Sequence, residues 1–272
     1  MAALQDNRLV RTFAELRDSG KRTMMPFLTA GYPDLATTGA LLRDIEARGV
    51  RICELGVPFS DPIADGPTIQ ASYTEALAAG VTSPKIFEMV RRYRDDGGQM
   101  ALTAMVSFSI VCRHGIEGYF GAAAEAGFDG AIIPDLPVDE AGAVEPAAAS
   151  AGLANILLIA PTTPPQRRLQ IAARSQGFIY FISVAGITGE RDRLPPETTD
   201  GVAELRKHTD TPVCVGFGIS RPEMVAAVCE AADGAIVGSA IIHRITDAKD
   251  AGRDRIVAEA GGFVEELLAP VR

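Results

Sequence analysis

Short apolar segments alternate with longer segments of helical character along almost the whole chain of 272 residues. The short segments are rich in branched and aromatic residues, which is typical of buried strands. Strands are predicted at residues 24–29, 51–55, 100–106, 130–134, 155–160, 178–183, 212–216 and 234–237. Strands that alternate with helices build a parallel sheet, and eight of them suffice to close a barrel.

The longer segments predict helices that connect these strands. They cover residues 38–48, 83–94, 116–126, 165–175, 201–208 and 221–231, with further helices at 8–18 and 253–268. No linker or low-complexity tract divides the chain, so we predict one domain over residues 1–272. The fold class is α/β, a single (β/α)8 TIM barrel whose extra N-terminal and C-terminal helices plug or flank it. The alternative is an open doubly wound sheet with a second domain.

Composition excludes several classes of protein. A formal charge of −9 argues against a nucleic-acid partner, which would require a basic face. No apolar run approaches the ~20 residues that span a bilayer, and no signal segment precedes the first helix, so we expect no membrane association and a soluble, cytoplasmic protein. The four cysteines are widely spaced and are expected to be buried free thiols. The three histidines lack metal-ligand spacing, so no metal site is predicted.

In barrels of this kind the chemistry takes place on loops that follow the carboxyl ends of the strands. The candidate loops are residues 30–34, 56–67, 184–199, 216–220 and 238–240, which are long or rich in Gly, Pro, Asp and Thr. Few lysines are present, and none lies at the carboxyl end of a predicted strand, so a Schiff-base mechanism is poorly supported. Proton transfer by carboxylates is the chemistry that remains.

Glu54 lies near the end of an otherwise apolar predicted strand. Strand alternation places it on the same face as Ile52, so we expect it to point into the barrel mouth, where poor solvation would raise its pKa. The alternative is a Glu that pairs with an Arg at the rim. Asp65 follows in a loop held by prolines and a glycine, which would keep its carboxylate over the mouth. Either Asp65 or Asp61 is expected to be a helix cap or a turn former.

A phosphate site is predicted from glycines that follow the last two strands. Residues 216–220 read GFGIS, and residues 237–240 read VGSA at the start of a predicted helix. Glycines and a helix N-terminus expose N–H groups to an anion, although tight turns also explain such glycines. Residues 185–189 could close over the phosphate as a lid, or form a surface insertion. Tyr180 packs in the core or donates a hydrogen bond to a substrate.

Several motifs together resemble one known family. Residues 54–62 read ELGVPFSDP and residues 64–70 read ADGPTIQ, and this pair resembles the signature of the tryptophan synthase alpha subunit family. Further matches, in the order of the family, are FLTAGYPD at 27–34, PDLP at 134–137, GITG at 186–189, GFGIS at 216–220 and VGSA at 237–240. The resemblance spans residues 8–268.

The resemblance implies a lyase of tryptophan biosynthesis that cleaves indole-3-glycerol phosphate into indole and D-glyceraldehyde 3-phosphate, without cofactor or metal. It implies that Glu54 is the acid and base, that Asp65 holds the indole N–H, and that Tyr180 assists. The implied substrate-binding residues are Phe27 and Ile69 around the indole, Gly189, Gly218, Gly238 and Ser239 around the phosphate, and Thr188 and Gly216 beside them. The implied partner is a tryptophan synthase beta subunit, in an α2β2 heterotetramer.

Two segments depart from the pattern of the family. Residues 107–111 read SFSIV where members usually show an aromatic pair followed by Asn-Pro, and Val184 stands where many members carry Arg. The first departure lies near the indole pocket and the beta-subunit contact of the family. Two alternatives therefore stay open, namely a stand-alone lyase that releases free indole and a non-catalytic subunit that binds a phosphate ligand and activates a partner enzyme.

Overall fold

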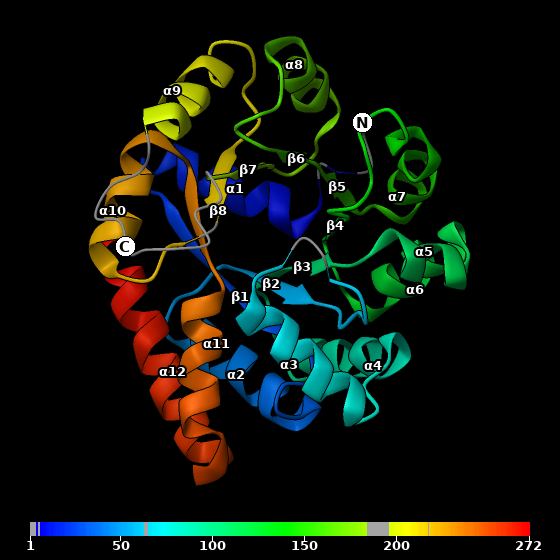
Figure 1. The fold of residues 1–272 in the computed structure, drawn as a ribbon, viewed down its shortest axis with the longest axis vertical. Coiled ribbons are helices and arrows are strands. Elements are labelled where there is room, and N and C mark those ends of the chain that lie inside the picture. The colour runs from blue at the N-terminus through cyan, green and yellow to red at the C-terminus, as the bar shows by residue number, and fades with distance from the viewer. Residues whose placement is uncertain (1–3, 5, 63–64, 184–195, 217) are drawn as a thin grey trace.

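A parallel sheet lies at the centre of the computed structural model, which describes residues 4, 6–62, 65–183, 196–216 and 218–272. Within these residues nine strands pair in the order β5-β4-β3-β2-β1-β9-β8-β7-β6, and the sheet curves into a nearly closed barrel (Figure 1). The strands are β1 (Thr23–Thr29), β2 (Ile52–Gly56), β3 (Ala101–Met105), β4 (Gly130–Ile132), β5 (Ala154–Ile156), β6 (Leu158–Ile159), β7 (Ile179–Ile182), β8 (Val213–Gly216) and β9 (Gly234–Val237). All eight predicted strands are present.

The fifth predicted strand is divided into β5 and β6 at Leu157. The N–H of Leu157 donates to the hydroxyl of Ser175 at 3.0 Å, and its carbonyl accepts from the N–H of Tyr180 at 3.0 Å. β5 pairs with β4, whereas β6 pairs with β7. The chain therefore passes from one edge of the sheet to the other at this point, which brings the two edges of the barrel together.

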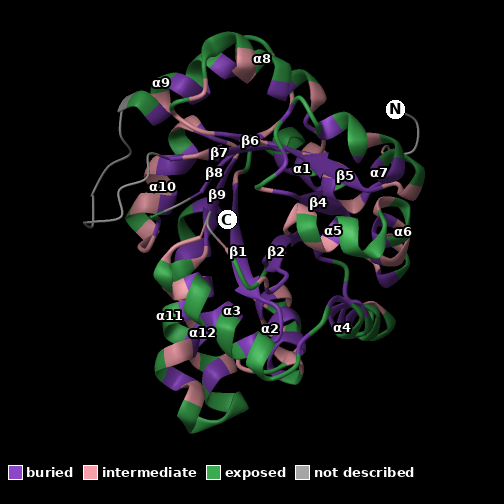
Figure 2. Cartoon of the chain, turned by 45° about the vertical axis from the view of Figure 1, so that its right-hand side comes forward, coloured by how far each residue is buried: buried purple, intermediate pink, exposed green. Residues whose placement is uncertain are grey.

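Helices surround the sheet, and their outer faces are exposed while the strands are buried (Figures 1 and 2). They are α1 (Arg8–Asp18), α2 (Leu35–Ala47), α3 (Pro67–Ala78), α4 (Ser83–Asp95), α5 (Phe108–His114), α6 (Ile116–Ala126), α7 (Glu145–Ala151), α8 (Pro165–Arg174), α9 (Pro196–Leu205), α10 (Pro222–Ala231), α11 (Ser239–Ala248) and α12 (Arg253–Leu268). Short 3-10 turns cover Ala141–Ala143, Lys249–Ala251 and Ala269–Val271. No helix in these described ranges is both long and apolar enough to cross a bilayer.

The predicted helices are present, but several others were missed. α3 and α7 contain mainly small or polar residues, so their apolar spacing is weak. The segment 107–111, which departs from the family pattern, caps and begins α5, with Ser107 as the N-cap. α9 begins at Pro196, inside the predicted loop 184–199, because Pro suits the first turn of a helix.

α1 closes the amino end of the barrel, as predicted for a plug. The side chain of Asn7 caps this helix and also donates to the carbonyls of Asp129 at 2.8 Å, directly before β4, and of Gly152 at 2.9 Å, two residues before β5. The ring of Phe13 lies 5.7 Å from that of Phe178, just before β7. Figure 1 shows α1 across the middle of the ring of strands. The amino end is therefore sealed, which leaves the carboxyl end for a site.

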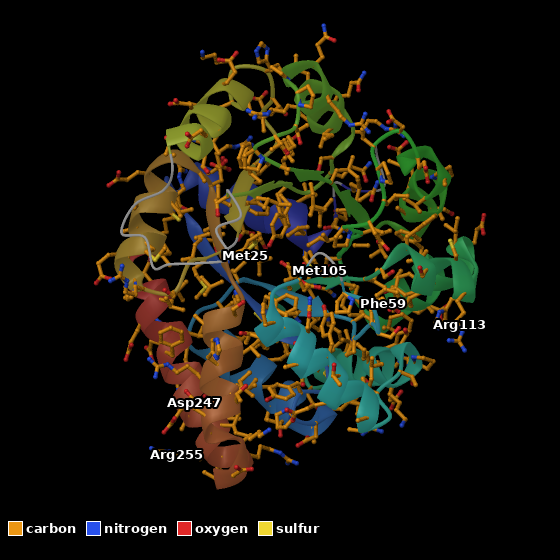
Figure 3. All side chains as sticks on the ribbon, viewed as in Figure 1. Met25, Phe59, Met105, Arg113, Asp247 and Arg255 are labelled. Carbon is orange, nitrogen blue, oxygen red and sulfur yellow. The ribbon has the colours of Figure 1, made fainter. Side chains whose placement is uncertain are left out.

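Inward-facing side chains follow the register of the strands. Phe27 of β1 pairs with Glu54 of β2, which pairs with Thr103 of β3. Figure 3 shows Met25 and Met105 toward the middle of the barrel. Buried thiols were expected for all the cysteines, but only Cys53, Cys214 and Cys229 are buried, whereas Cys112 is exposed on α5.

Candidate active site

One cavity at the carboxyl ends of the strands gathers most of the predicted site residues. It has a volume of about 330 Å³. The lining residues that were predicted are Phe27, Glu54, Asp65, Ile69, Tyr180, Gly218, Gly238 and Ser239. Thr188 and Gly189 lie outside the described residues, so their predicted contacts stay predictions. The eight predicted residues that line the cavity come from β1, β2, α3, β7 and α11 and from the loops after β2, β8 and β9. This is expected for the carboxyl end of a barrel, where active sites lie.

Glu54 is buried, and its carboxyl group has no partner in the part of the chain that the structure describes. Its side chain is on β2, it is 2% exposed, and neither carboxylate oxygen has a hydrogen-bond partner among the described residues. The alternative of an Arg partner at the rim is therefore wrong for this part of the chain. Burial, followed by the negative charge of Asp65, raises the pKa of Glu54 to about 8. At neutral pH this carboxyl group holds its proton most of the time.

Asp65 lies over the same cavity at the end of the loop that follows β2. Its N–H donates to the carbonyl of Pro62 at 3.1 Å, and its own carbonyl accepts from the side chain of Gln70 at 2.8 Å. Burial raises the pKa of Asp65 to about 6, so it is mainly ionised at neutral pH. The two carboxylates thus share a cavity with different protonation states.

One Asp of this loop was expected to be a helix cap or a turn former, and the structure confirms the turn former. α3 begins after Gly66, which has no side chain to cap it, and Asp65 instead takes part in a turn. Asp61 is exposed and accepts a hydrogen bond from the hydroxyl of Ser60 at 2.6 Å. Asp61 lines a smaller neighbouring cavity, together with Asp65 and Tyr73.

Tyr180 is buried with its ring against the backbone of β8. A Cβ atom added to Gly216 would lie 2.8 Å from Cζ of Tyr180, so only glycine leaves room for the ring. Burial, followed by the charges of Glu54 and Asp65, raises the pKa of Tyr180 well above its usual value. Its hydroxyl therefore stays protonated beside both carboxylates. Gly216 makes space for this tyrosine and is not among the residues that line the cavity.

The opposite side of the cavity offers backbone N–H groups. α11 begins at Ser239 directly after Gly238, and no side chain caps it. The carbonyl of Gly238 accepts from the N–H groups of Ile241 at 2.9 Å and Ile242 at 3.1 Å. The N–H groups of the first residues of a helix have no acceptor within the helix, so this end is suited to an anion. Gly218 lies nearby with a φ of 76°, a left-handed conformation that favours glycine.

Other lining residues were not predicted. They are Met105, Ile219, Ser220, Ile236, Ala240 and His243. Met105 lies two residues after the β3 residue that pairs with Glu54, so strand alternation could have identified it as inward-facing. The same argument, carried across β1 to β9, could have identified Ile236. The spacing of four residues from Ser239 could have identified His243, because such residues lie on one face of a helix.

Comparison with known proteins agrees with this geometry. The model of the family "Tryptophan synthase alpha chain" matches residues 13–267. The tryptophan synthase alpha chain of Rhodopirellula baltica is 44% identical over 264 residues, which are 94% of this chain and 95% of the relative. That of Chloroflexus aggregans is also 44% identical, over 97% of each chain.

Solved structures give the same result. Tryptophan synthase subunit alpha from Legionella pneumophila superposes with a TM-score of 0.89 at 32% identity, over 97% of this chain and 98% of that one. A chain of tryptophan synthase from M. tuberculosis superposes with a TM-score of 0.84 at 32% identity, over 98% of this chain and 100% of that one. With its carboxylate pair, its uncapped helix and these relatives, the chain belongs to the tryptophan synthase alpha chain family.

Proposed function

We propose that Glu54 and Asp65 carry out the reaction of this family, the cleavage of indole-3-glycerol phosphate into indole and D-glyceraldehyde 3-phosphate. The observation that carries the proposal is the buried carboxyl group of Glu54, which has no hydrogen-bond partner among the described residues and shares one cavity with Asp65 and the start of α11. A buried polar group without partners is unfavourable in the free protein. A substrate that supplies the missing partners turns this arrangement into binding and catalysis.

Glu54 acts first as an acid and then as a base. Since its pKa is about 8, it holds a proton at neutral pH and donates that proton to the indole carbon that carries the glycerol chain. The resulting carboxylate then removes the proton of the adjacent glycerol hydroxyl. As the oxygen forms the aldehyde C=O, the carbon–carbon bond breaks and its electron pair returns to the indole ring. Glu54 ends the cycle protonated, so no external acid, base or oxidant is consumed.

Asp65 stabilises the ring during these steps. Protonation of the ring carbon places positive charge on the indole nitrogen, and a carboxylate that accepts the N–H hydrogen bond opposes that charge. A pKa of about 6 keeps Asp65 ionised for this role at neutral pH. Two carboxylates whose surroundings separate their pKa values are typical of acid–base sites. Tyr180 assists beside both groups as a hydrogen-bond donor.

The two ends of the substrate fit the two sides of the cavity. The apolar side chains of Phe27 and Ile69 suit the indole ring. The N–H groups at the start of α11, with Gly218, Gly238 and Ser239, suit the phosphate. Thr188 and Gly189 are proposed to add contacts from the segment outside the described residues.

The beta subunit is the proposed partner, in an α2β2 assembly that converts the released indole. The alpha chain is one of the chains in tryptophan synthase, and a chain of the M. tuberculosis enzyme is matched over its full length. We further propose that residues 1–272 form one domain and that the enzyme works in the cytoplasm, where amino acids are synthesised.

An assay with indole-3-glycerol phosphate tests the proposal. The purified chain is incubated with the substrate alone and then with a tryptophan synthase beta subunit and serine, and indole and tryptophan are measured. We expect slow release of indole from the chain alone and faster cleavage with a cognate beta subunit, because partner-induced closure assembles the site and excludes water. Fast release that no beta subunit changes would indicate the stand-alone lyase. No cleavage in any mixture, with binding of the substrate, would indicate the activator subunit.

A further inference from the structure

His243 has an unexplained position in the cavity. It lies on α11, four residues after Ser239, and lines the same cavity as the catalytic carboxylates. Among the described lining residues it is the only one whose side chain can carry a positive charge. A positive charge close to the N-terminus of a helix is unfavourable for the helix itself. Stability of α11 therefore does not explain a side chain that can carry a positive charge at this place.

The imidazole is held by a residue from another helix. Its Nε2 atom lies 2.9 Å from the hydroxyl of Thr68, at the start of α3. Thr68 follows Asp65 by three residues, so this bond links the loop that carries Asp65 to the helix that would bind the phosphate. Nδ1 of His243 has no hydrogen-bond partner in the described part of the chain. One ring nitrogen is thus used to fix the ring, and the other is left for a ligand.

The other ionisable groups of the cavity favour a positive charge at the phosphate end of the substrate. The carboxyl groups that line the cavity are those of Glu54 and Asp65, and Asp65 is ionised at neutral pH. A phosphate monoester adds one or two further negative charges. N–H groups at the start of α11 supply only about half of an elementary charge. A cationic side chain next to them would reduce the repulsion between the phosphate and Asp65.

We propose that His243, held by Thr68, is a positioning residue that supplies positive charge to the phosphate end of the substrate. This inference rests on the proposed function, because it assumes that a phosphate monoester binds at the start of α11. The bond between His243 and Thr68 then also ties phosphate binding to the position of the loop that carries Asp65. Phosphate affinity should therefore depend on both residues, whereas indole affinity should not.

Calorimetric titration of the full chain with glycerol 3-phosphate, and separately with indole, tests the proposal at one mildly acidic pH. His243→Gln keeps a side chain that can bond to Thr68 but removes the charge, and we expect glycerol 3-phosphate to bind about 5- to 10-fold more weakly. His243→Lys keeps a charge and should bind within about 3-fold of wild type. Thr68→Val keeps the imidazole of His243 but removes its hydrogen bond, and the affinity for glycerol 3-phosphate should fall about 2- to 4-fold.

Indole affinity and steady-state kinetics separate positioning from a structural role. For His243→Gln we expect unchanged indole affinity and a KM for indole-3-glycerol phosphate that rises more than kcat falls. Loss of indole affinity together with phosphate affinity would overturn the proposal, since a general structural change would then explain both. It would also be overturned if His243→Gln bound glycerol 3-phosphate like wild type, or if His243→Lys bound it as weakly as His243→Gln.

A substitution at Gly238 distinguishes failure of this inference from failure of the proposed function. Gly238→Asp places a carboxylate at the start of α11 and should weaken glycerol 3-phosphate binding about 10-fold or more. If Gly238→Asp weakens binding and His243→Gln does not, only the role of His243 is wrong. If wild type binds no glycerol 3-phosphate, or Gly238→Asp has no effect, the phosphate site is elsewhere and both proposals fail.

Discussion

Two buried carboxylates, at opposite ends of the barrel, have opposite surroundings. Asp129, at the amino end, is 3% exposed and is bound by Arg8 at 2.8 Å, by Arg94 at 3.0 Å and by the N–H of Leu102 at 2.9 Å. Glu54, in the carboxyl half of the barrel, is 2% exposed and has no hydrogen-bond partner within the described residues. Burial alone therefore does not distinguish a structural acid from one that is proposed to be catalytic.

The partners explain the different roles. Burial raises the pKa of both groups, but for Asp129 the two arginines and the N–H of Leu102 offset part of that effect. A carboxylate with satisfied oxygens joins α1, α4 and β3 at the sealed end of the barrel. A carboxylate without partners destabilises the free protein and keeps its oxygens available for a substrate. The comparison predicts that substitutions at the two ends affect different properties.

Glu54→Gln should have the largest effect on catalysis. The amide keeps the shape of the side chain but does not exchange a proton, so turnover should fall about 100- to 10,000-fold. Steady-state cleavage of indole-3-glycerol phosphate measures this, and binding of glycerol 3-phosphate serves as the control for an intact site. Retention of more than about a tenth of wild-type turnover, a loss below ~1.4 kcal/mol, would remove Glu54 from the mechanism.

Asp65→Asn should reduce turnover by about 100-fold or more, because the neutral side chain no longer opposes positive charge on the indole ring. Asp61→Asn is the matched control, since it changes the other Asp of the same loop, which is exposed. The assay uses the isolated chain, so that effects on beta-subunit docking do not enter. A larger defect for Asp61→Asn than for Asp65→Asn would exchange their roles.

Asp129→Asn should instead reduce stability. It leaves Arg8 and Arg94 without their counter-charge, and removal of one partner from a buried ion pair typically destabilises a protein by about 3–5 kcal/mol. Urea unfolding measures the loss, and the control Asp96→Asn, which breaks a surface pair with Arg43 at 3.2 Å, should change stability by less than about 1 kcal/mol. Folded Asp129→Asn protein should keep most of its turnover. A stable but inactive Asp129→Asn variant would contradict the prediction that the amino end of the barrel serves stability and the carboxyl end serves catalysis.

The pH dependence of stability gives the smallest expected effect. The folded pKa of Glu54 is about 8 and lies above the unfolded value of 4.5, so the folded state binds more protons between these values. The contribution of Glu54 to stability therefore falls as pH rises through this window. Glu54→Gln lacks this dependence, so its stability relative to wild type should increase by about 1–3 kcal/mol from pH 5 to pH 8.

Urea unfolding of the Glu54→Gln variant and the wild type across that range provides the measurement. Asp61→Asn, the exposed-carboxylate variant, is the control, and its difference from wild type should stay nearly constant. If the difference in unfolding free energy between Glu54→Gln and wild type also stayed constant with pH, the carboxyl group of Glu54 would not be a source of destabilisation.

Much of the site could be predicted from local pattern. Period-two alternation placed Glu54 on the inward face of β2, and the apolar run around it indicated burial. Glycines and a helix start after β9 indicated where α11 begins. Weak local pattern explains the failures, since α7 is mostly alanine and has no apolar period to detect. His243 was missed although its spacing of four residues from Ser239, at the start of a predicted helix, placed it on the same helix face.

The sequence by itself determined where the strands lie along the chain, the inward direction of Glu54 and the family to which the chain belongs. These depend on neighbours in the chain, through side-chain alternation, turn residues and short motifs. Only the tertiary structure decided that no hydrogen-bond partner among the described residues reaches Glu54, that two arginines reach Asp129, and that Thr68 contacts a histidine 175 residues away. The physical reason is that partners of a buried polar group come from whichever elements the barrel brings together. Their separation along the sequence does not predict which residues come into contact.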